Sequence, residues 1–338
     1  MAKSSDENSE MPIYLQQIDL TGEYKELIST LPLEKGWIKM PFHQYQGCWI
    51  GTTTLQNVLS CQQHFQALDT DILLVTSPKS GTTWLKALTF ALLNRKKYSN
   101  VHLNHPLLIS NPHDLVPFFE HDLYINKDIL PNLNSLSHPR LFSTHLPYHL
   151  LPKSVKESRC KIVYLCRDPK DNLVSFWHFI NKLRPQSMEK LALHELFESF
   201  CRGVSPFGPF WEHILGYWKE SLMERSNKVM FLRYEEMKKK PDFYLKKLAE
   251  FMECPFSKEE ESKGVIGDIL NLCSFEKLSG LEVNKIGKVG TGVENKYFFR
   301  RGQVGDWKNL FTTEMIKQID NWLNMDLVFR DFKILFIK

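Results

Sequence analysis

Short apolar runs along the chain are followed by longer segments in which apolar residues recur every three or four positions. Runs rich in branched apolar residues, typical of strands buried on both faces of a sheet, lie at 71–75, 161–166 and 228–234. After the first run, Trp84, Leu88 and Leu92 recur every fourth residue, which predicts a helix with one apolar face. The pattern therefore predicts buried strands that lead directly into helices.

The remaining segments give a coarser prediction. Residues 24–31 are expected to form a short helix, 36–45 a loop or an edge strand, and 55–65 an amphipathic helix. Residues 190–224 are expected to be helical around an interrupting Gly/Pro cluster, and 285–295 a flexible loop. Residues 1–12 are polar and predicted to be disordered, which leaves 13–338 as a single domain.

The residues between the first strand and its helix are small, with a single lysine. Thr76 to Thr83 reads Thr-Ser-Pro-Lys-Ser-Gly-Thr-Thr, so the helix begins on hydroxyl residues. Backbone N–H groups at a helix N-terminus bind anions, and Lys79 adds a full positive charge. This arrangement indicates an anion site, with an ordinary strand-to-helix connection as the alternative.

Lys-Ser-Gly-Thr-Thr-Trp at 79–84 resembles the nucleotide loop of the cytosolic sulfotransferases, whose donor is 3′-phosphoadenosine 5′-phosphosulfate (PAPS). A phosphate-loop NTPase would need a lysine directly after its second glycine, whereas here the lysine precedes the glycine. The resemblance covers about residues 35–332, and 111–119 is similar to the plant branch. It implies an α/β fold with a central, mainly parallel sheet flanked by helices, the P-loop nucleotide-kinase-like sulfotransferase fold.

Composition and charge agree with a cytoplasmic protein. The 338 residues are 43% hydrophobic and carry a net charge of +4, too even to indicate nucleic acid as a partner. The seven cysteines lack CxxC spacing, which favours reduced thiols over disulfides or a zinc site. No apolar run approaches the roughly 20 residues that span a bilayer, so no membrane association is expected.

His145 follows a short apolar segment in Leu141-Phe-Ser-Thr-His-Leu-Pro147. Open α/β sheets bind ligands at the carboxyl ends of their strands, although a lone histidine there is more often structural. Thr-His-Leu-Pro matches the family motif whose histidine is the catalytic base, and the resemblance implies this role for His145. Ser143 stands where many animal members have a lysine, so a contribution from that lysine is not carried over.

Arg167 and Ser175 follow the second buried strand. Asp171 is the predicted N-cap of the next helix, which places Ser175 about one turn inside it. An arginine and a hydroxyl that converge suit a phosphate, and the family has this pair at the donor's 3′-phosphate. The alternative is a salt bridge from Arg167 to Asp168 or Asp171, with Ser175 on the helix surface.

Further matches to the family lie in the second half of the chain. Tyr234 ends the third strand and matches a tyrosine that contacts adenine, and Phe275 lies in a segment that closes over the adenine. Arg300-Arg301-Gly302 matches the family's second clamp on the 3′-phosphate. Core packing remains the alternative for Phe275, and surface charge for the two arginines.

The resemblance implies that His145 takes the proton of an acceptor hydroxyl while Lys79 stabilises the leaving 3′-phosphoadenosine 5′-phosphate (PAP). The donor site would comprise Lys79, Ser80, Gly81, Thr82, Thr83, Trp84, Arg167, Ser175, Tyr234, Phe275, Arg300, Arg301 and Gly302. No metal is expected, because fixed cations neutralise the donor and the histidines form no His-Glu-x-x-His motif of the zincins.

Two other classes of function remain open, a kinase that would require ATP and Mg²⁺ and an inactive binding protein on the same scaffold. The acceptor is expected to be a small hydroxylated plant metabolite, such as a flavonol or other phenolic, a brassinosteroid or a hydroxyjasmonate-like compound. Its predicted aromatic pocket comprises Phe42, His43, Phe118, Phe119 and Phe142. Residues 308–317 depart from the animal dimer motif, so a monomer is expected.

Overall fold

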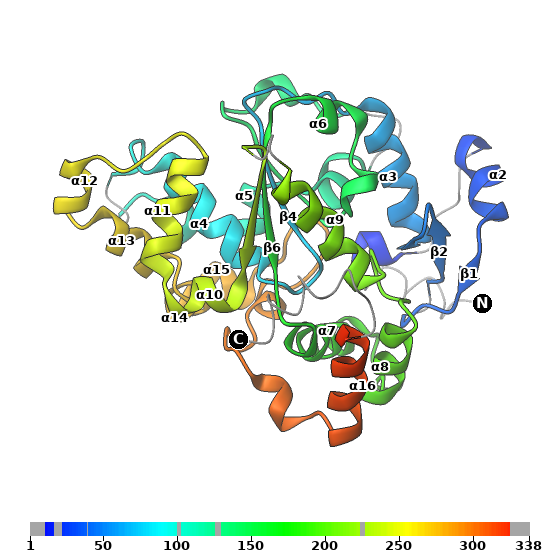
Figure 1. Cartoon of the computed structure of the whole chain (residues 1–338). Helices are drawn as coiled ribbons and strands as arrows, with labels where there is room; N and C mark the ends of the chain where they lie inside the picture. Colours follow the sequence, from blue (N-terminus) through cyan, green and yellow to red (C-terminus); the bar gives the residue numbers. More distant parts are fainter. Residues whose placement is uncertain are drawn as a thin grey trace.

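Four parallel strands in the order β5-β4-β6-β7 form the centre of the computed structural model shown in Figure 1. The structure describes residues 11–16, 22–38, 40–99, 103–125, 130–223 and 227–324. The strands are β1 (Leu33–Glu34), β2 (Phe42–Tyr45), β3 (Cys48–Gly51), β4 (Ile72–Thr76), β5 (Leu141–Thr144), β6 (Lys161–Cys166) and β7 (Val229–Arg233).

The helices surround this sheet on both faces (Figure 1). The α-helices are α2 (Gly22–Thr30), α3 (Thr52–His64), α4 (Thr82–Asn94), α5 (Pro112–Leu115), α6 (Lys153–Glu157), α7 (Pro169–Leu183), α8 (Leu193–Cys201), α9 (Phe210–Leu222), α10 (Tyr234–Lys239), α11 (Pro241–Phe251), α12 (Lys258–Ser262), α13 (Val265–Leu272), α14 (Phe275–Gly280), α15 (Glu282–Ile286) and α16 (Thr313–Asn324). Short helical turns are η1 (Ile13–Leu15), η2 (Pro106–Leu108), the π-helix η3 (Phe119–Leu123), η4 (Leu133–Ser135), η5 (Tyr148–Leu150), η6 (Asn295–Phe298) and η7 (Asp306–Asn309).

Alternate side chains of β4 enter two separate apolar layers. Leu73 and Val75 belong to a core with residues of α3, α7 and α9, whereas Ile72 and Leu74 belong to a core with residues of α4, α11 and α13. All four side chains are buried. A strand buried on both faces needs apolar residues at every position, which explains the continuous apolar run. The predicted α/β fold with a mainly parallel sheet is confirmed.

The parallel register brings the carboxyl ends of the strands to one edge of the sheet. Val75 pairs with Thr144 of β5 and Tyr164 of β6, and Cys166 pairs with Arg233 of β7. After β4 the chain continues into α4 on one face, and after β6 it continues into α7 on the other. Ligands of open α/β sheets bind where consecutive connections diverge in this way.

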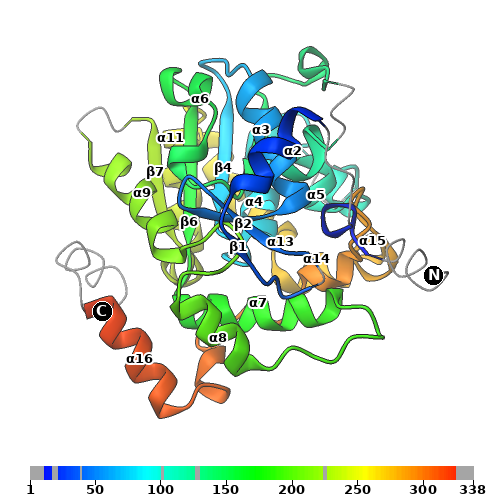
Figure 2. The same cartoon turned by 90° about the vertical axis from the view of Figure 1, so that its right-hand side faces the viewer.

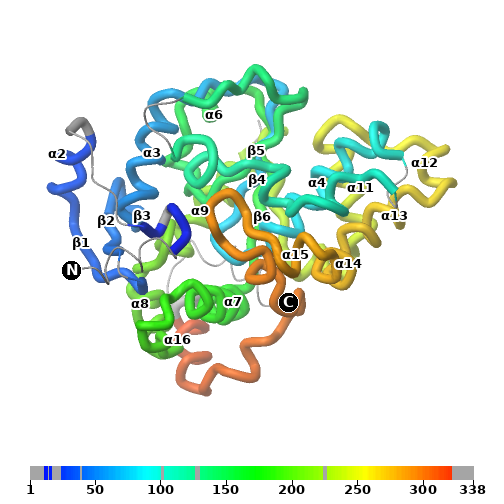
Figure 3. The backbone as a smooth tube through the Cα atoms, turned by 180° about the vertical axis from the view of Figure 1, so that it is seen from behind, coloured from blue at the N-terminus to red at the C-terminus, as the bar shows by residue number. Residues whose placement is uncertain are grey.

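Several later segments close the same end of the molecule. Figures 1 and 2 show α7 and α8 below the sheet, at the end where β6 leads into α7. The segment after α15 folds back over this end, and its turn η6 contacts α7 (Figure 3). Residues separated by more than 200 positions in the sequence therefore meet beside the carboxyl ends of the strands.

A second, antiparallel sheet consists of β1, β2 and β3, and it packs on α3. The segment 36–45, predicted as a loop or an edge strand, forms a loop that leads into β2. Residues 1–10 of the predicted disordered tail lie outside the described part of the chain, while Met11 is buried. None of the described helices is long and apolar enough to cross a membrane.

Candidate active site

The connection from β4 to α4, residues 77–81, takes two backbone conformations that favour glycine. Gly81 caps α4 with a φ of 108°, and a Cβ at this position would lie 2.8 Å from Cδ2 of Tyr234. Lys79 has a φ of 67°, which is uncommon for a residue with a side chain. The side-chain amide of Asn172 on α7 donates to the Pro78 carbonyl over 2.7 Å and to Ser80 Oγ over 3.1 Å. This loop is therefore held in its shape by α7.

A cavity of about 260 Å³ opens beside this loop. It is lined by every predicted catalytic and donor-site residue except Ser80: His145, Lys79, Gly81, Thr82, Thr83, Trp84, Arg167, Ser175, Tyr234, Phe275, Arg300, Arg301 and Gly302. Ser80 is fully buried, and its hydroxyl contacts Ser77 Oγ as well as Asn172. Ser80 is thus placed as a support of the loop rather than as a lining residue.

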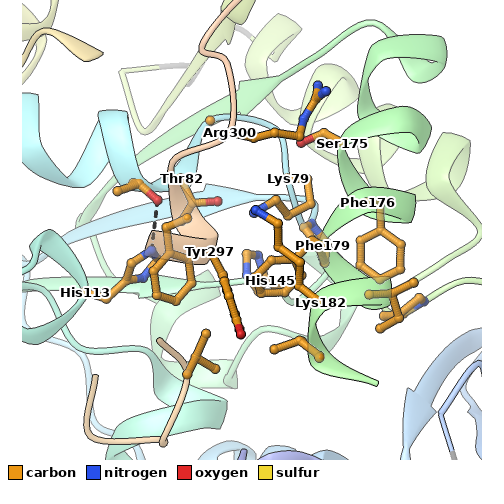
Figure 4. A pocket seen from close by; sticks show the side chains of 18 of the residues that line it. Lys79, Thr82, His113, His145, Ser175, Phe176, Phe179, Lys182, Tyr297 and Arg300 are labelled. Carbon is orange, nitrogen blue, oxygen red and sulfur yellow. Dashed lines mark hydrogen bonds between the residues drawn. The ribbon is translucent and has the colours of Figure 1, made fainter. Parts of the chain in front are cut away.

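Lys79 reaches into the middle of this cavity (Figure 4). Its ammonium group lies 3.9 Å from the ring centroid of Phe179, and no carboxylate of the described residues pairs with it. Burial, together with the nearby positive charges of Arg167, Lys182 and Arg300, lowers the pKa of Lys79 to about 7. A cation in such surroundings is stabilised by any anion that enters the cavity.

Arg167 and Arg300 present guanidinium groups to one end of the cavity, where Figure 4 shows Arg300 beside Ser175. Arg167 donates to the carbonyl of Gln303 over 2.9 Å. The Nε atoms of Arg167 and Arg300 are buried without a hydrogen-bond partner among the described residues. Buried donors of this kind are satisfied by an anionic ligand, so this end of the cavity fits a phosphate.

The helix α7 begins differently from the sequence prediction. Its N-cap is Asp168, which accepts hydrogen bonds from the backbone N–H of Lys170 and Asp171, so the prediction of Asp171 was wrong. Asp171 accepts instead from the backbone N–H of Gly305 and Trp307. These bonds hold the segment that carries Arg300 and Arg301 against α7. Asp306 pairs with both arginines and fixes their side chains.

Aromatic rings surround the part of the cavity next to these arginines. Trp84 and Tyr234 meet edge to face, with their centroids 5.6 Å apart. The ring of Phe275 lies against Gly302, where a Cβ would approach Phe275 Cδ2 to 2.7 Å. Gly302 has a φ of 62°. Only glycine therefore allows the chain to pass this close beneath the ring.

His145 follows β5 and is oriented by Thr76, the last residue of the neighbouring strand β4. Its Nδ1 lies 2.7 Å from the Thr76 carbonyl oxygen. Because a carbonyl only accepts, Nδ1 carries the proton and Nε2 is left as a free acceptor. Burial lowers the pKa of His145 well below its usual value, and the nearby His121 lowers it further. The ring is therefore a neutral base at physiological pH.

Glu120 fixes the backbone at His145 through two hydrogen bonds. Its carboxylate accepts from the His145 backbone N–H over 2.6 Å and from the Thr144 hydroxyl over 2.8 Å. The side chain is fully buried, and burial raises the pKa of Glu120 to about 7. Glu120 could not be recognised from the local sequence, because its partners lie more than 20 residues further along the chain.

Thr83 at the start of α4 belongs to a chain of directed hydrogen bonds. Lys86 Nζ donates to the Val116 carbonyl and lies 3.1 Å from His113 Nδ1, while His113 Nε2 lies 2.9 Å from Thr83 Oγ1. Since the lysine donates to Nδ1, Nε2 carries the ring proton and donates to Thr83. The Thr83 hydroxyl is then left with its own hydrogen to donate to a ligand in the cavity. Figure 4 shows His113 and its hydrogen bond to Thr83 as a dashed line.

Only part of the predicted aromatic pocket lines the cavity. Phe118 lies 4.7 Å from the His145 ring, and Phe42 also lines the cavity. His43, Phe119 and Phe142 do not, so their assignment was wrong. His43 bonds to the Thr52 hydroxyl, and the other two rings pack on Phe65 in the core. The phenylalanine, tyrosine and tryptophan residues that line the cavity and were not predicted from the sequence are Trp37, Phe176, Phe179, Phe207, Tyr297, Phe298 and Phe299.

The helical spacing of α7 contained a signal for two lining residues that were not predicted, the aromatic Phe179 and the basic Lys182. Phe179 and Lys182 follow Ser175 at intervals of four and three residues, so they share its face of the helix and its exposure to the cavity.

Among the described residues, no group of three or more histidine, cysteine or acidic side chains is arranged to hold a metal ion.

Comparisons with known proteins agree on one family. Residues 69–330 match the family described as sulfotransferase domain. The chain is 52% identical to Cytosolic sulfotransferase 5 of Arabidopsis thaliana over 311 residues, which cover 92% of this chain and 96% of the relative. It is 50% identical to Cytosolic sulfotransferase 12 of the same plant, over 93% of this chain and 94% of the relative.

Solved structures of similar proteins share the fold. The crystal structure of an Arabidopsis thaliana putative steroid sulphotransferase covers 90% of this chain and 94% of its own, with a TM-score of 0.70 and 43% identity. Mouse sulfotransferase SULT7A1, solved in complex with PAP, covers 87% of this chain and 98% of its own, with a TM-score of 0.65 and 27% identity. The chain therefore belongs to the sulfotransferase family, in its plant cytosolic branch, and is a PAPS-dependent transferase.

Proposed function

We propose that this protein transfers the sulfuryl group of PAPS to a hydroxyl of a small plant metabolite in the cytosol, and that it acts as a monomer. One observation carries the proposal: the free Nε2 of His145 and the ammonium group of Lys79 belong to the same cavity, between the arginines and the apolar walls (Figure 4). A base and a cation placed together in this way suit the removal of a proton and the stabilisation of a leaving group.

The donor's 3′-phosphate is assigned to Arg167, Ser175, Arg300, Arg301 and the backbone of Gly302. The unpartnered Nε atoms of Arg167 and Arg300 support this assignment, since charge-assisted donors are the usual partners of phosphate. Trp84, Tyr234 and Phe275 would contact the adenine ring. The 5′-phosphosulfate is assigned to Thr82, Thr83 and the backbone N–H groups at the start of α4.

PAPS supplies a sulfuryl group attached to a good leaving group. His145 accepts the proton of the acceptor hydroxyl at Nε2, because its Nδ1 proton is engaged by Thr76. Lys79 stabilises negative charge that develops on the bridging oxygen, for which it must be protonated. The anionic donor raises the pKa of Lys79 from its value of about 7 in the free protein and so keeps it charged.

The acceptor is assigned to the apolar part of the cavity around His145. Phe118 and Phe207 lie within 6 Å of its ring, and Phe42 lines the same cavity. Aromatic walls with few polar groups suit a compact, largely apolar molecule that carries a hydroxyl group. A flavonol or other phenolic, a brassinosteroid and a hydroxyjasmonate-like compound all meet this description.

The test is transfer of radiolabelled sulfate from PAPS to a panel of hydroxylated plant metabolites, with EDTA present throughout. We expect labelled product with wild-type protein and at most a trace with Lys79→Met. Calorimetry under the same conditions should show PAP binding without added metal. Tight binding of Mg²⁺-ATP with no affinity for PAP would favour a kinase, and PAP binding with no transfer to any acceptor would favour an inactive binding protein.

A further inference from the structure

Lys182 lies in the last turn of α7, on the helical face that lines the cavity. Ser175, Phe179 and Lys182 follow one another along this face, so Lys182 lies about 10 Å along the helix axis from Ser175. In Figure 4, Ser175 and Arg300 lie at one side of the cavity, and the side chains of Lys79 and Lys182 lie further into it. Lys182 is therefore displaced along α7 from the phosphate-binding end of the cavity.

No described carboxylate pairs with Lys182. Its ammonium group lies 5.5 Å from the centroid of the Tyr297 ring, and the charged groups that act on it are the cations Arg300 and Lys296. Partial burial and these cations lower the pKa of Lys182. Lys182 in turn lowers the pKa of Lys79. Arg300 is paired with Asp306 and Lys296 with Glu294, whereas no described carboxylate pairs with Lys79 or Lys182, so an anion that binds beside these two lysines is stabilised.

The walls next to Lys182 are apolar. Ile180 and Leu183 flank it on α7 and line the cavity, and Trp37 lines it from the loop before β2. Among the described residues that line the cavity, the acidic side chain is Asp122, which accepts from the Phe118 backbone N–H. A ligand that fits here has an apolar body with one anionic group.

We propose that the acceptor is a hydroxylated carboxylic acid whose carboxylate pairs with Lys182 while its hydroxyl group reaches His145. The inference rests on the proposed function and narrows its acceptor to acids. The donor's own anionic groups have other partners in the cavity, namely the arginines, Ser175 and the loop with Lys79. Lys182 remains exposed to solvent, so it stands where an acceptor enters.

A simpler role for Lys182 exists in the helix itself. A lysine in the last turn of a helix interacts favourably with the helix dipole, and Lys182 is in this position. This role would make no distinction between a carboxylic acid and its ester. A comparison of such pairs therefore separates acceptor recognition from helix stabilisation.

The experiment measures kcat/KM with PAPS for para-hydroxyphenylpropanoic acid and its methyl ester, and for a hydroxylated alicyclic acid and its methyl ester. The wild-type protein should prefer an acid over its ester by about five- to thirtyfold, the worth of a partly exposed charge pair. Lys182→Met should abolish this preference, and Lys182→Arg should keep it. PAP affinity should be unchanged in both variants.

The matched control is Lys238→Met. Lys238 lines the same cavity beside Trp84, with its ammonium group 5.6 Å from the centroid of that ring. The Lys238→Met variant should leave the ratio of kcat/KM for acid and ester unchanged. The inference is overturned if wild-type protein shows no preference for either acid, or if Lys182→Met keeps the preference. It is also overturned if Lys182→Met weakens PAP binding and slows acid and ester equally, because Lys182 then serves the donor.

These outcomes differ from a failure of the proposed function. If the protein binds PAP and sulfates neutral phenols or esters with the same kcat/KM as acids, only the inference about Lys182 fails. If it neither binds PAP nor transfers sulfate to any acceptor, the proposed function fails together with it.

Discussion

The imidazole of His113 donates a hydrogen bond from Nε2 to the hydroxyl oxygen of Thr83, over 2.9 Å. Lys86 fixes the direction of this bond, because its ammonium group occupies Nδ1 of the same ring. Burial and the charge of Lys86 hold the pKa of His113 well below its usual value, so the ring stays neutral. A neutral ring in this tautomer leaves the Thr83 hydroxyl as a donor towards the cavity.

Thr83→Val and His113→Leu should therefore weaken the same interaction with the donor's 5′ group. Each single variant should raise the Kd of PAP by about tenfold, and the double variant should raise it little further. His113→Gln, whose amide can both accept from Lys86 and donate to Thr83, should restore much of the affinity. Calorimetry with adenosine 3′-phosphate is the control, since this ligand lacks the 5′ group. Additive effects of the two substitutions would contradict the relationship.

His145→Ala should lower kcat by about 10²–10⁴ while the Kd of PAP changes little, because the residue acts on the acceptor. His149→Ala is the matched control, since His149 lies outside the cavity lining and donates to the Gln46 carbonyl. The lowered pKa of His145 keeps it neutral at pH 6.5 and above. Loss of kcat/KM through protonation of the base should thus appear only below pH 6.5, and an acid limb above that value would refute the assignment.

Binding of PAP at pH 8 should take up a proton on Lys79. Its pKa of about 7 leaves it largely neutral at pH 8 in the free protein, and the bound anion raises this pKa. At pH 6, Lys79 is already protonated and contributes no uptake. Calorimetry in buffers of different ionisation enthalpy should show an uptake of up to about one proton at pH 8, absent in Lys79→Met. An equal uptake in both proteins would assign the proton to another group.

Arg300→Ala should raise the Kd of PAP by about 10- to 150-fold, the worth of one charge-assisted hydrogen bond. Adenosine 5′-phosphate, which lacks the 3′-phosphate, should bind equally to the variant and the wild type. Arg202→Ala serves as the control, because Arg202 is exposed and lies 3.7 Å from Glu34, outside the cavity lining. An equal loss of affinity for both ligands would place Arg300 elsewhere in the donor site.

Asp71→Asn should lower the free energy of unfolding by about 3–5 kcal/mol, because it leaves the Arg140 guanidinium buried and without its partner. Asp71 accepts from Arg140 over 2.7 and 2.5 Å at the amino end of β4, far from the cavity. Asp69→Asn is the control, since its pair with Arg159 is exposed. Urea unfolding should show a lower midpoint for Asp71→Asn alone, with PAP affinity preserved in the folded protein.

The strands and the donor loop could be predicted from the sequence because their signals are local. The apolar run before Thr76 spans one strand, and the small residues after it can form only a tight turn into α4. His145 was placed correctly for the same reason, at the end of β5.

Interactions between distant segments could not be predicted in this way. Asp171 has the sequence context of an N-cap, yet it bonds to backbone groups more than 130 residues later in the chain. Glu120 and His113 act through Thr144, His145 and Thr83, which lie in other elements. Phe119 and Phe142 were expected in the pocket, but the packing of α3 on this side of the sheet encloses them. Aromatic content alone does not show which rings face a cavity.

Thr76 contacts both the proposed base His145 and Thr82 of the proposed donor site. Its carbonyl fixes the imidazole of His145, and its hydroxyl lies 2.7 Å from that of Thr82 at the start of α4. A shift of the donor loop that moves Thr82 therefore reaches the base through a single peptide unit. The position of the His145 ring is therefore coupled to the position of Thr82 in the donor site. Binding of the donor and orientation of the base are linked in this way before any acceptor enters.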